Sequence, residues 1–430
     1  MKKINKFIQN NLRLTKTKTA KQTFVLFSSQ ILVVGLGIIT ATLNTRILGP
    51  KDYGILAFFS TITGFTLLFF RFGLFSSIGL LLAQEKNKKE ERELIGTSIL
   101  TGILVGISYS LFIFISSFFV DDIFKTNINH ILRIISPILF ILPFQMLIPQ
   151  ISRGTNKIYH LMWFNIIPKG LYVIGIVSIL LLGLTTIKIS TLILINLIST
   201  IIGGIIINYN FRPLFNNSKK NFQKIWQKNK KYGIHLYWGQ IADQSTYKLD
   251  GIFVSYFINT TQLGFYSLAA AITSPMAMLS QSLSTSLFKG FTEKDKIPKK
   301  ILYFNFLWLS LCVLGLVLLG KFIVTLFFAD KFLPVVSLIL PLALAGFSQG
   351  MYQPYNMFLG AKGMGKWMRN ISFAGSIFNV VGNLIFVICW GVIGIAVASA
   401  ISRLISFSLH FFYYKKYLKN EQIIEKNLSQ

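Results

Sequence analysis

Long apolar runs alternate with short polar stretches along almost the whole chain. Each run is close to or longer than the roughly 20 helical residues that cross a bilayer core of about 30 Å, so each predicts a membrane-spanning helix. The twelve runs fall at 24–44, 54–82, 94–120, 131–150, 160–183, 188–209, 233–258, 264–288, 301–328, 333–358, 369–389 and 391–413. We therefore expect an all-α polytopic membrane protein.

The basic residues give these runs an orientation. Lys and Arg gather in the even-numbered loops and at the two ends of the chain, which hold 32 of them, against 5 in the odd-numbered loops. Cytoplasmic loops of membrane proteins carry the excess of Lys and Arg. Both termini are therefore expected in the cytoplasm, and the protein in the plasma (inner) membrane.

Two similar motifs indicate an internal repeat. YGILA at 53–57 and LGFYSLA at 263–269 register on Gly54 and Gly264, about half a chain apart. Because six is even, two six-helix lobes would share one orientation and form a parallel repeat; a chance match of short apolar motifs is the alternative. The expected divisions are a cytoplasmic basic arm 1–23, an N-terminal lobe 24–210, a basic linker 211–232, a C-terminal lobe 233–413 and a cytoplasmic tail 414–430.

The first motif belongs to a polar stop between two runs, TRILGPKDYGILA at 45–57. Gly49 and Pro50 predict the end of one helix and the start of the next, at the outer side. Tyr53 is expected at the membrane interface as an amphipathic anchor. The residues assigned to this outer turn and its echo are Arg46, Gly49, Tyr53, Gly54, Gly264 and Tyr266.

Composition excludes several classes of protein. With 53% hydrophobic and 13% charged residues, and a mean hydropathy of +0.60, the chain is not a water-soluble globule. Its formal charge of +29 lies in short blocks between the runs, which favours membrane topology over nucleic-acid binding. Cys312 and Cys389 lie inside apolar runs and support neither a disulfide framework nor a metal site. Apolar residues among the lysines of the arm and the linker predict contact with anionic phospholipid, with a solvated basic loop as the alternative.

A few ionisable residues remain inside the runs, where a charge facing lipid costs about 2.5–3.5 kcal/mol on insertion scales. Well inside the runs they are Arg71, Lys169, Asp243, Lys248, Asp250 and Arg403, with Arg133 and Lys321 nearer the ends. We expect the four cations well inside the runs to line a water-filled cavity, whose positive potential suits an anionic substrate. Structural pairing of Arg71 and Arg403 with carbonyls or carboxylates is the alternative.

Asp243 and Asp250 share one face of a predicted helix with Gln240 and Tyr247, at a spacing of i, i+3, i+7 and i+10. They are candidates for positioning the cations or for binding a coupling proton or sodium ion. A position of Asp250 in solvent at the end of its helix is the alternative.

The sequence has no phosphate-binding loop and no H-E-x-x-H motif, so we expect no cofactor or metal and no enzyme. Energy would come from an ion gradient or from the substrate's own concentration difference. The short outward loops argue against a membrane glycan polymerase or ligase, which usually needs an extramembrane catalytic loop.

Four motifs together carry a family resemblance. They are R-x-L-G-P-x-x-Y-G at Arg46–Gly54, F-G-L-F-S-S-I at Phe72–Ile78, R-G-T-N-K at Arg153–Lys157, and D-G-I-F-V with L-G-F-Y-S-L-A within Asp250–Ala269. The chain resembles the polysaccharide-export branch of the multidrug, oligosaccharidyl-lipid and polysaccharide (MOP) exporter superfamily. More narrowly, it is similar to Wzx-type flippases of O-antigen or capsule repeat units.

The resemblance implies a MATE-like fold whose lobes rock about a central cavity by alternating access. It implies that undecaprenyl-diphosphate-linked oligosaccharide moves from the cytoplasmic to the outer leaflet, for O-antigen, capsule or exopolysaccharide synthesis. A polysaccharide polymerase and a chain-length regulator are the implied partners. Ion-coupled multidrug efflux is the main alternative, although the first six runs have no clear central carboxylate. A lipid II flippase would usually carry more than twelve spans.

Overall fold

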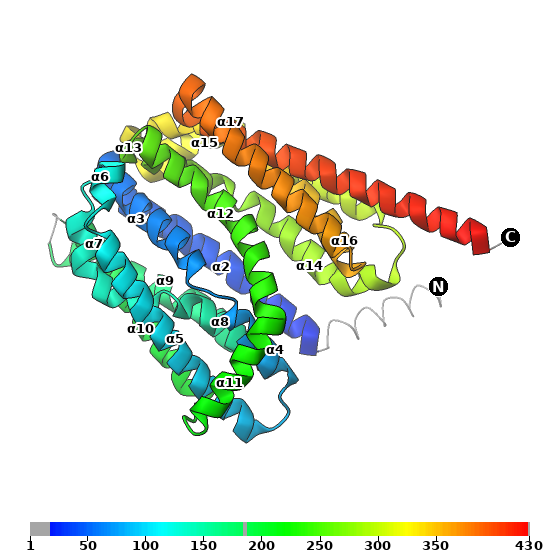
Figure 1. Cartoon of the computed structure of the whole chain (residues 1–430). Coiled ribbons are helices and arrows are strands. Elements are labelled where there is room, and N and C mark those ends of the chain that lie inside the picture. The colour runs from blue at the N-terminus through cyan, green and yellow to red at the C-terminus, as the bar shows by residue number, and fades with distance from the viewer. Residues whose placement is uncertain (1–17, 184–186, 429–430) are drawn as a thin grey trace, which may run out of the picture. The chain divides into compact units, whose positions relative to one another are not determined.

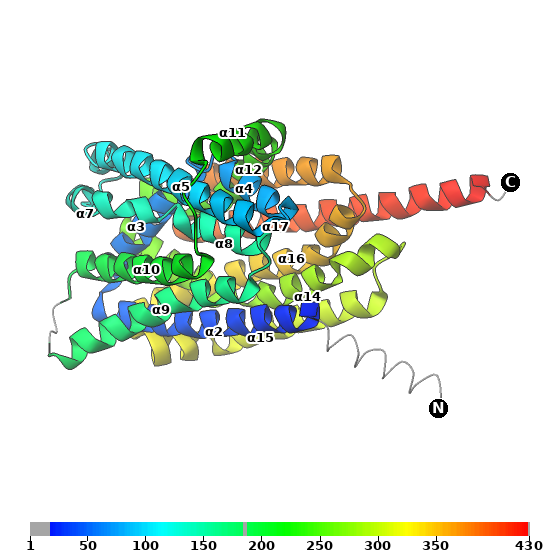
Figure 2. The same cartoon turned by 90° about the horizontal axis from the view of Figure 1, so that it is seen from below.

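The computed structural model describes residues 18–183 and 187–428 of the chain, and these contain helices and turns but no strand (Figures 1 and 2). The apolar positions of the basic arm before residue 18 lie outside the described residues. The first helices are α2 Lys18–Ile47, α3 Pro50–Phe69, α4 Leu74–Gln84, α5 Lys88–Ser116, α6 Val120–Phe124, α7 Asn129–Ile135, η1 Ser136–Ile141, α8 Phe144–Gly154, α9 Ile158–Leu181, α10 Ile189–Phe211 and α11 Ser218–Lys228. The others are η2 Asn229–Gly233, α12 Ile234–Phe257, α13 Thr260–Thr273, α14 Met276–Glu293, α15 Lys299–Phe328, η3 Asp330–Val335, α16 Val336–Ala361 and α17 Gly365–Leu428.

Every predicted run lies on one helix or on consecutive helical segments. Within the described residues, nine helices are long and apolar enough to cross a membrane, and the pair α13–α14, bent by 48°, makes a tenth. The helix α12 is not among them and carries three charged residues, while α17 covers two predicted runs. The expectation of an all-α polytopic membrane protein is confirmed.

The last two runs are joined by a turn inside α17. Gly391 has φ 59° and ψ −134°, a conformation that residues with a Cβ rarely adopt. A Cβ at Gly394 would overlap the carbonyl of Phe386, so the second half returns very close to the first. Figure 1 shows the orange and red halves of α17 running in opposite directions.

The run 54–82 was expected to be one helix, and this is wrong. The helix α3 ends at Phe69 and α4 begins at Leu74, with Phe72 at φ 47° and Gly73 at φ 73° between them. A hydrogen bond from the linker stabilises this break, since Asn229 Nδ2 donates to the Phe72 carbonyl at 2.9 Å. A charge at Arg71 followed by a left-handed glycine explains why the helix stops here.

The chain forms two compact units. Unit 1 comprises residues 1–40, 70–115 and 133–237, and in it α9 and α10 pack side by side (Figures 1 and 2). The start of the linker is docked on α5: Arg92 Nε donates to the Arg212 carbonyl at 2.7 Å, and Asn217 Nδ2 donates to Glu93 at 3.0 Å. The linker is thus partly helical and fixed to its own unit.

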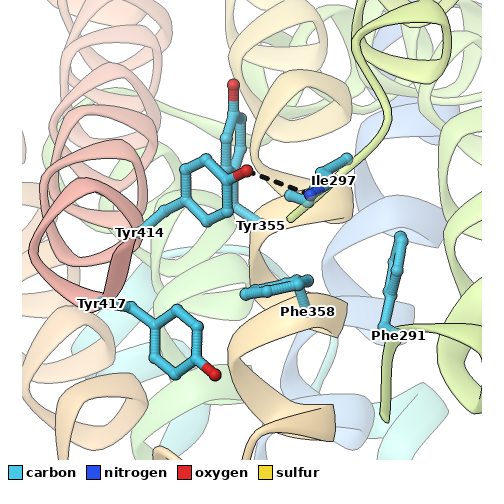
Figure 3. Close-up of a cluster of buried hydrophobic side chains, with 6 residues drawn as sticks. All are labelled: Phe291, Ile297, Tyr355, Phe358, Tyr414 and Tyr417. Atoms are coloured by element: carbon cyan, nitrogen blue, oxygen red, sulfur yellow. Dashed lines mark hydrogen bonds between the residues drawn. The ribbon is translucent and has the colours of Figure 1, made fainter. Parts of the chain in front are cut away.

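Unit 2 comprises residues 41–69, 116–132 and 238–430. An aromatic cluster joins α14, α16 and α17 in this unit (Figure 3). Its Tyr414 hydroxyl accepts a hydrogen bond from the Ile297 backbone N–H at 3.0 Å, which ties the α14–α15 connection to α17. The units divide the chain differently from the two predicted lobes, and those lobes stay a prediction.

The polar stop at 45–57 forms the predicted turn in unit 2. The helix α2 ends at Ile47 and Pro50 occupies the first position of α3, as expected of proline. The two glycines of the repeat motifs meet where α3 and α13 pack together. A Cβ at Gly54 would overlap the Thr260 carbonyl, and one at Gly264 would lie 3.0 Å from the Gly54 nitrogen.

Two other residues of the turn have contacts that the sequence did not predict. Arg46 Nη2 donates to the Leu326 carbonyl at 2.7 Å and its Nε donates to the Phe327 carbonyl at 3.2 Å, so the guanidinium caps the C-terminus of α15. Tyr53 is buried, with its ring edge on Phe332 at 5.7 Å. The prediction of Tyr53 as an interfacial anchor is wrong, because neighbouring helices of unit 2 cover it.

Candidate functional site

The carboxylate of Asp250 lies inside unit 2 among neutral hydrogen-bond donors. Its Oδ1 accepts from Asn383 Nδ2 at 2.8 Å and from Asn379 Nδ2 at 3.2 Å. Its Oδ2 accepts from the Tyr266 hydroxyl at 2.8 Å and from the Ser399 hydroxyl. Only 3% of Asp250 is exposed, so the alternative of a solvent position at the end of the helix is wrong. We call Asp250, Tyr266, Asn379, Asn383 and Ser399 the Asp250 cluster.

The helices that form this cluster come from distant parts of the sequence. Asp250 lies on α12 and Tyr266 on α13, while α17 contributes the two asparagines one turn apart, before Gly391, and Ser399 after it. The hairpin in α17 therefore brings both of its halves to one carboxylate. Asn383 is fully buried, and its Oδ1 makes no hydrogen bond to any described residue.

A cavity of about 80 Å³ borders the cluster on one side. Asp250, Ser399 and Arg403 line it, and Arg403 Nη1 donates to Gln349 Oε1 at 2.8 Å. Serines 372, 376, 402 and 406 extend the polar wall toward His410, whose ring stacks on Tyr352 at 4.9 Å. The space is large enough for a small hydrated ion or a few waters.

A second cavity, of about 360 Å³, lies in the same unit, and we call it the chamber. The helices α2, α3, α12 and α13 supply its walls, which are Asn44, Tyr53, Leu56, Ala57, Ser60, Thr61, Lys248, Gly251, Tyr266, Ser267 and Ala270. The half-buried Lys248 supplies a positive charge among hydroxyl and amide groups. The volume falls in the range of ordinary ligand pockets, and its walls suit phosphate or sugar oxygens.

The helix α12 faces both cavities. Lys248 and Asp250 are two residues apart, so they project about 200° apart around the helix and present opposite charges to opposite sides. The fit to α3 is close: a Cβ at Gly64 would lie 3.0 Å from Lys248 Nζ, and one at Gly251 would lie 2.9 Å from the Thr61 methyl. Gly64 thus leaves room for the Lys248 side chain, and Gly251 lets α12 approach Thr61 closely.

The other predicted cavity cations have described contacts within their own units. In unit 1, Arg71 Nε contacts the Met146 sulfur at 2.8 Å, and Lys169 Nζ donates to the Val33 carbonyl at 3.4 Å. In unit 2, Arg403 lines the smaller cavity while Lys248 lines the chamber. The side chain of Asp243 lies outside the described part of the chain. The shared cavity of the four cations therefore stays a prediction.

The polar partners of Asp250 were missed in the sequence. Single Asn and Ser residues are common in membrane helices, and these lie 129 to 149 residues from Asp250. A usable signal was the asparagine pair at i, i+4 inside the apolar run 369–389. Tyr266 was assigned to the outer turn, whereas its hydroxyl belongs to the Asp250 cluster.

The donor set limits which ion the cluster suits. Among the described residues, no group of three or more His, Cys, Asp or Glu could hold a transition metal. One carboxylate with hydroxyl and amide oxygens is a hard ligand set of low charge, which fits a monovalent cation. Because the O and N of an amide are assigned from their hydrogen bonds, a turn of the Asn383 amide would direct its buried Oδ1 to such an ion.

Comparison with known proteins gives the chain its family. A family model described as polysaccharide biosynthesis protein matches residues 19–293, which is more than half of the chain. The chain belongs to the polysaccharide biosynthesis protein family. No curated protein matches the sequence.

Solved structures share the fold of this polysaccharide biosynthesis protein. Lipid II flippase MurJ in an inward closed conformation matches with a TM-score of 0.66 and 17% identity, covering 94% of this chain and 90% of that one. An inward-facing multidrug resistance MATE family transporter of the MOP superfamily matches with a TM-score of 0.68 and 15% identity, and the match covers 93% of this chain and 95% of that one. The MATE multidrug transporter DinF-BH matches with a TM-score of 0.64 and 16% identity, and the match covers 92% of this chain and 94% of that one. The family match confirms the expected likeness to polysaccharide-export proteins, and these structures confirm the expected MATE-like fold.

Proposed function

We propose that this protein flips undecaprenyl-diphosphate-linked oligosaccharide repeat units from the cytoplasmic to the outer leaflet of the plasma membrane, for synthesis of a surface polysaccharide. Membership of the polysaccharide biosynthesis family, with a MurJ-like fold, supports a lipid-linked glycan as the substrate. The chamber is the observation that carries the proposal. Its lysine and hydroxyl groups suit a diphosphate with attached sugars, whereas the half-buried charge of Lys248 disfavours the cationic drugs of multidrug efflux.

The test is deletion of the gene in its host, with staining of surface polysaccharide and extraction of lipid-linked intermediates. We expect loss of surface glycan and accumulation of single repeat units that an impermeant periodate or lectin reagent does not reach in intact spheroplasts. Single units that the reagent reaches would indicate a missing polymerase instead. Normal glycan with increased sensitivity to cationic drugs would replace the proposal with multidrug efflux.

We also propose that a monovalent cation, Na⁺ or H⁺, binds at Asp250 and couples an ion gradient to transport. A buried carboxylate costs free energy unless its charge is compensated, and neutral donors compensate it only in part. Asp250→Asn would remove the charge and keep the shape. Its carbonyl oxygen would still accept from the two asparagines, while its new NH₂ group would face hydroxyls that can rotate to accept.

Thermal unfolding of the purified protein tests this ion site. In NaCl the wild type should unfold at a higher temperature than in choline chloride of equal ionic strength, because a bound ligand stabilises the folded state. Asp330→Asn, which removes an exposed carboxylate of the same unit, is the matched control and should keep the response. An equal response of wild type and Asp250→Asn would refute the site.

A further inference from the structure

Tyr266 belongs both to the chamber wall and to the Asp250 cluster. Tyr266 lines the chamber together with Ser267 and Lys248, and its hydroxyl donates to Asp250 Oδ2 at 2.8 Å. We propose that Tyr266 is the coupling residue, which transmits the occupancy of Asp250 by a cation to the affinity of the chamber for an anionic ligand. The proposal rests on the proposed function and adds how its two sites communicate.

The geometry makes this tyrosine a shared donor. Only 7% of Tyr266 is exposed, and its hydroxyl lies 2.8 Å from Asp250 Oδ2 and 3.4 Å from the Ser399 hydroxyl. A phenol has one O–H to donate. While that proton is bound to Asp250, it is not available to a ligand in the chamber.

Binding of a cation to Asp250 changes which acceptor the Tyr266 O–H can use. A metal cation on Oδ2 competes with the Tyr266 O–H, and a protonated Asp250 can itself donate to the phenol oxygen. Either way the O–H of Tyr266 loses its acceptor on Asp250 and keeps the long contact to the Ser399 hydroxyl at 3.4 Å, and a poorly paired buried donor is costly. A phosphate or sugar oxygen in the chamber restores the hydrogen bond, so the cation should strengthen ligand binding.

The charge of Lys248 indicates which class of ligand the chamber binds. It lies on the chamber side of α12 and attracts an anion, while Asp250 on the other side attracts a cation. Tyr266, from α13, links the two sides of that helix. By thermodynamic linkage, the ligand must strengthen cation binding by the same factor, and such factors are typically about 5- to 150-fold.

The experiment measures binding of undecaprenyl diphosphate, the part common to the proposed substrates, to the purified full-length protein. Affinity is determined in NaCl and in choline chloride, and in choline chloride at two pH values to separate sodium from protons. The wild type should bind the probe at least about 5-fold more tightly with the cation. Tyr266→Phe, which keeps the ring, should bind with equal affinity in both salts, while sodium still raises its unfolding temperature.

Tyr53→Phe is the matched control, because Tyr53 is another buried tyrosine of the chamber wall. Tyr53→Phe can change the affinity for the probe, but the ratio of its affinities in NaCl and in choline chloride should equal that of the wild type. If Tyr266→Phe keeps that ratio, the coupling role is refuted and the proposed function stands. If the wild type binds the probe with equal affinity in all these conditions, both the ion coupling and the role of Tyr266 are refuted.

A second measurement does not depend on the stability of Tyr266→Phe. 3-Fluorotyrosine at position 266 keeps the hydroxyl and reports its surroundings through the ¹⁹F resonance. We expect the resonance to shift on addition of sodium or acid and again on addition of undecaprenyl diphosphate. A resonance that responds to only one of the two ligands, or to neither, would overturn the proposal.

Discussion

Substitution of Gly54 tests the close crossing of α3 and α13. A Cβ at Gly54 would overlap the carbonyl oxygen and carbon of Thr260, and both neighbouring atoms belong to backbone. A flexible side chain could move aside, but a helix backbone can yield only if α3 and α13 separate. Gly54→Ala should therefore destabilise unit 2, although alanine is the better helix former.

The magnitude follows from two opposing effects. Alanine in place of glycine inside a helix gains about 1 kcal/mol. Overpacking a filled interface costs about 1–3 kcal/mol, and the upper end applies when the obstacle is backbone on both sides. The net loss should be about 2 kcal/mol. Gly315→Ala is the matched control within the same unit, because its Cβ would meet no described atom within 4 Å and only the helix-propensity gain remains.

The assay is thermal unfolding of both purified variants in one detergent. Gly54→Ala should unfold several degrees below the wild type, and Gly315→Ala at or slightly above it, a difference of about 3 kcal/mol between two identical substitutions. Equal unfolding temperatures for both variants and the wild type would refute the crossing.

Three further predictions follow from described contacts. Lys248→Met should abolish surface polysaccharide while the protein still inserts into the membrane, whereas Lys248→Arg should keep part of it; wild-type glycan in Lys248→Met would remove this lysine from substrate binding. Arg46→Gln should lower the stability by about 1 kcal/mol in thermal unfolding, because the α15 C-terminus loses a charged cap, and Arg46→Lys should lose less. Trp226 on α11 is 46% exposed, so brominated anionic phospholipid in vesicles should quench its fluorescence more than brominated neutral lipid does; equal quenching of the wild type and Trp226→Phe would argue against α11 lying on the membrane.

Helix positions could be predicted from the sequence because a bilayer imposes both a length and an apolar composition on each span. The break between α3 and α4 was missed, although Arg71 and Gly73 marked it, since apolar residues on both sides outweigh a short interruption. The bend between α13 and α14 had a similar signal in Pro275. Hydropathy measures solvation averaged over many residues, and a change in backbone direction needs only two or three of them.

The candidate site could be predicted only in part. Asp250 was recognisable because a charge inside an apolar run is costly and requires an explanation. Its partners are neutral, and neutral polar residues leave almost no trace in a hydropathy pattern. Tyr266 was assigned to a turn by similarity to the motif at Gly54, yet its role depends on a contact with α12 that no local pattern contains.

The hairpin at Gly391 also bears on how the protein is made. Asp250 leaves the ribosome 129 residues before Asn379, so its carboxylate enters the bilayer long before the α17 groups that bind it exist. The two halves of α17 meet at a turn with no polar linker, which favours their insertion together as one helical hairpin. Insertion of the hairpin would then bring three of the four described hydrogen-bond donors of this buried carboxylate, and a chain truncated before the hairpin would present to membrane quality control an Asp250 left with the Tyr266 hydroxyl as its donor.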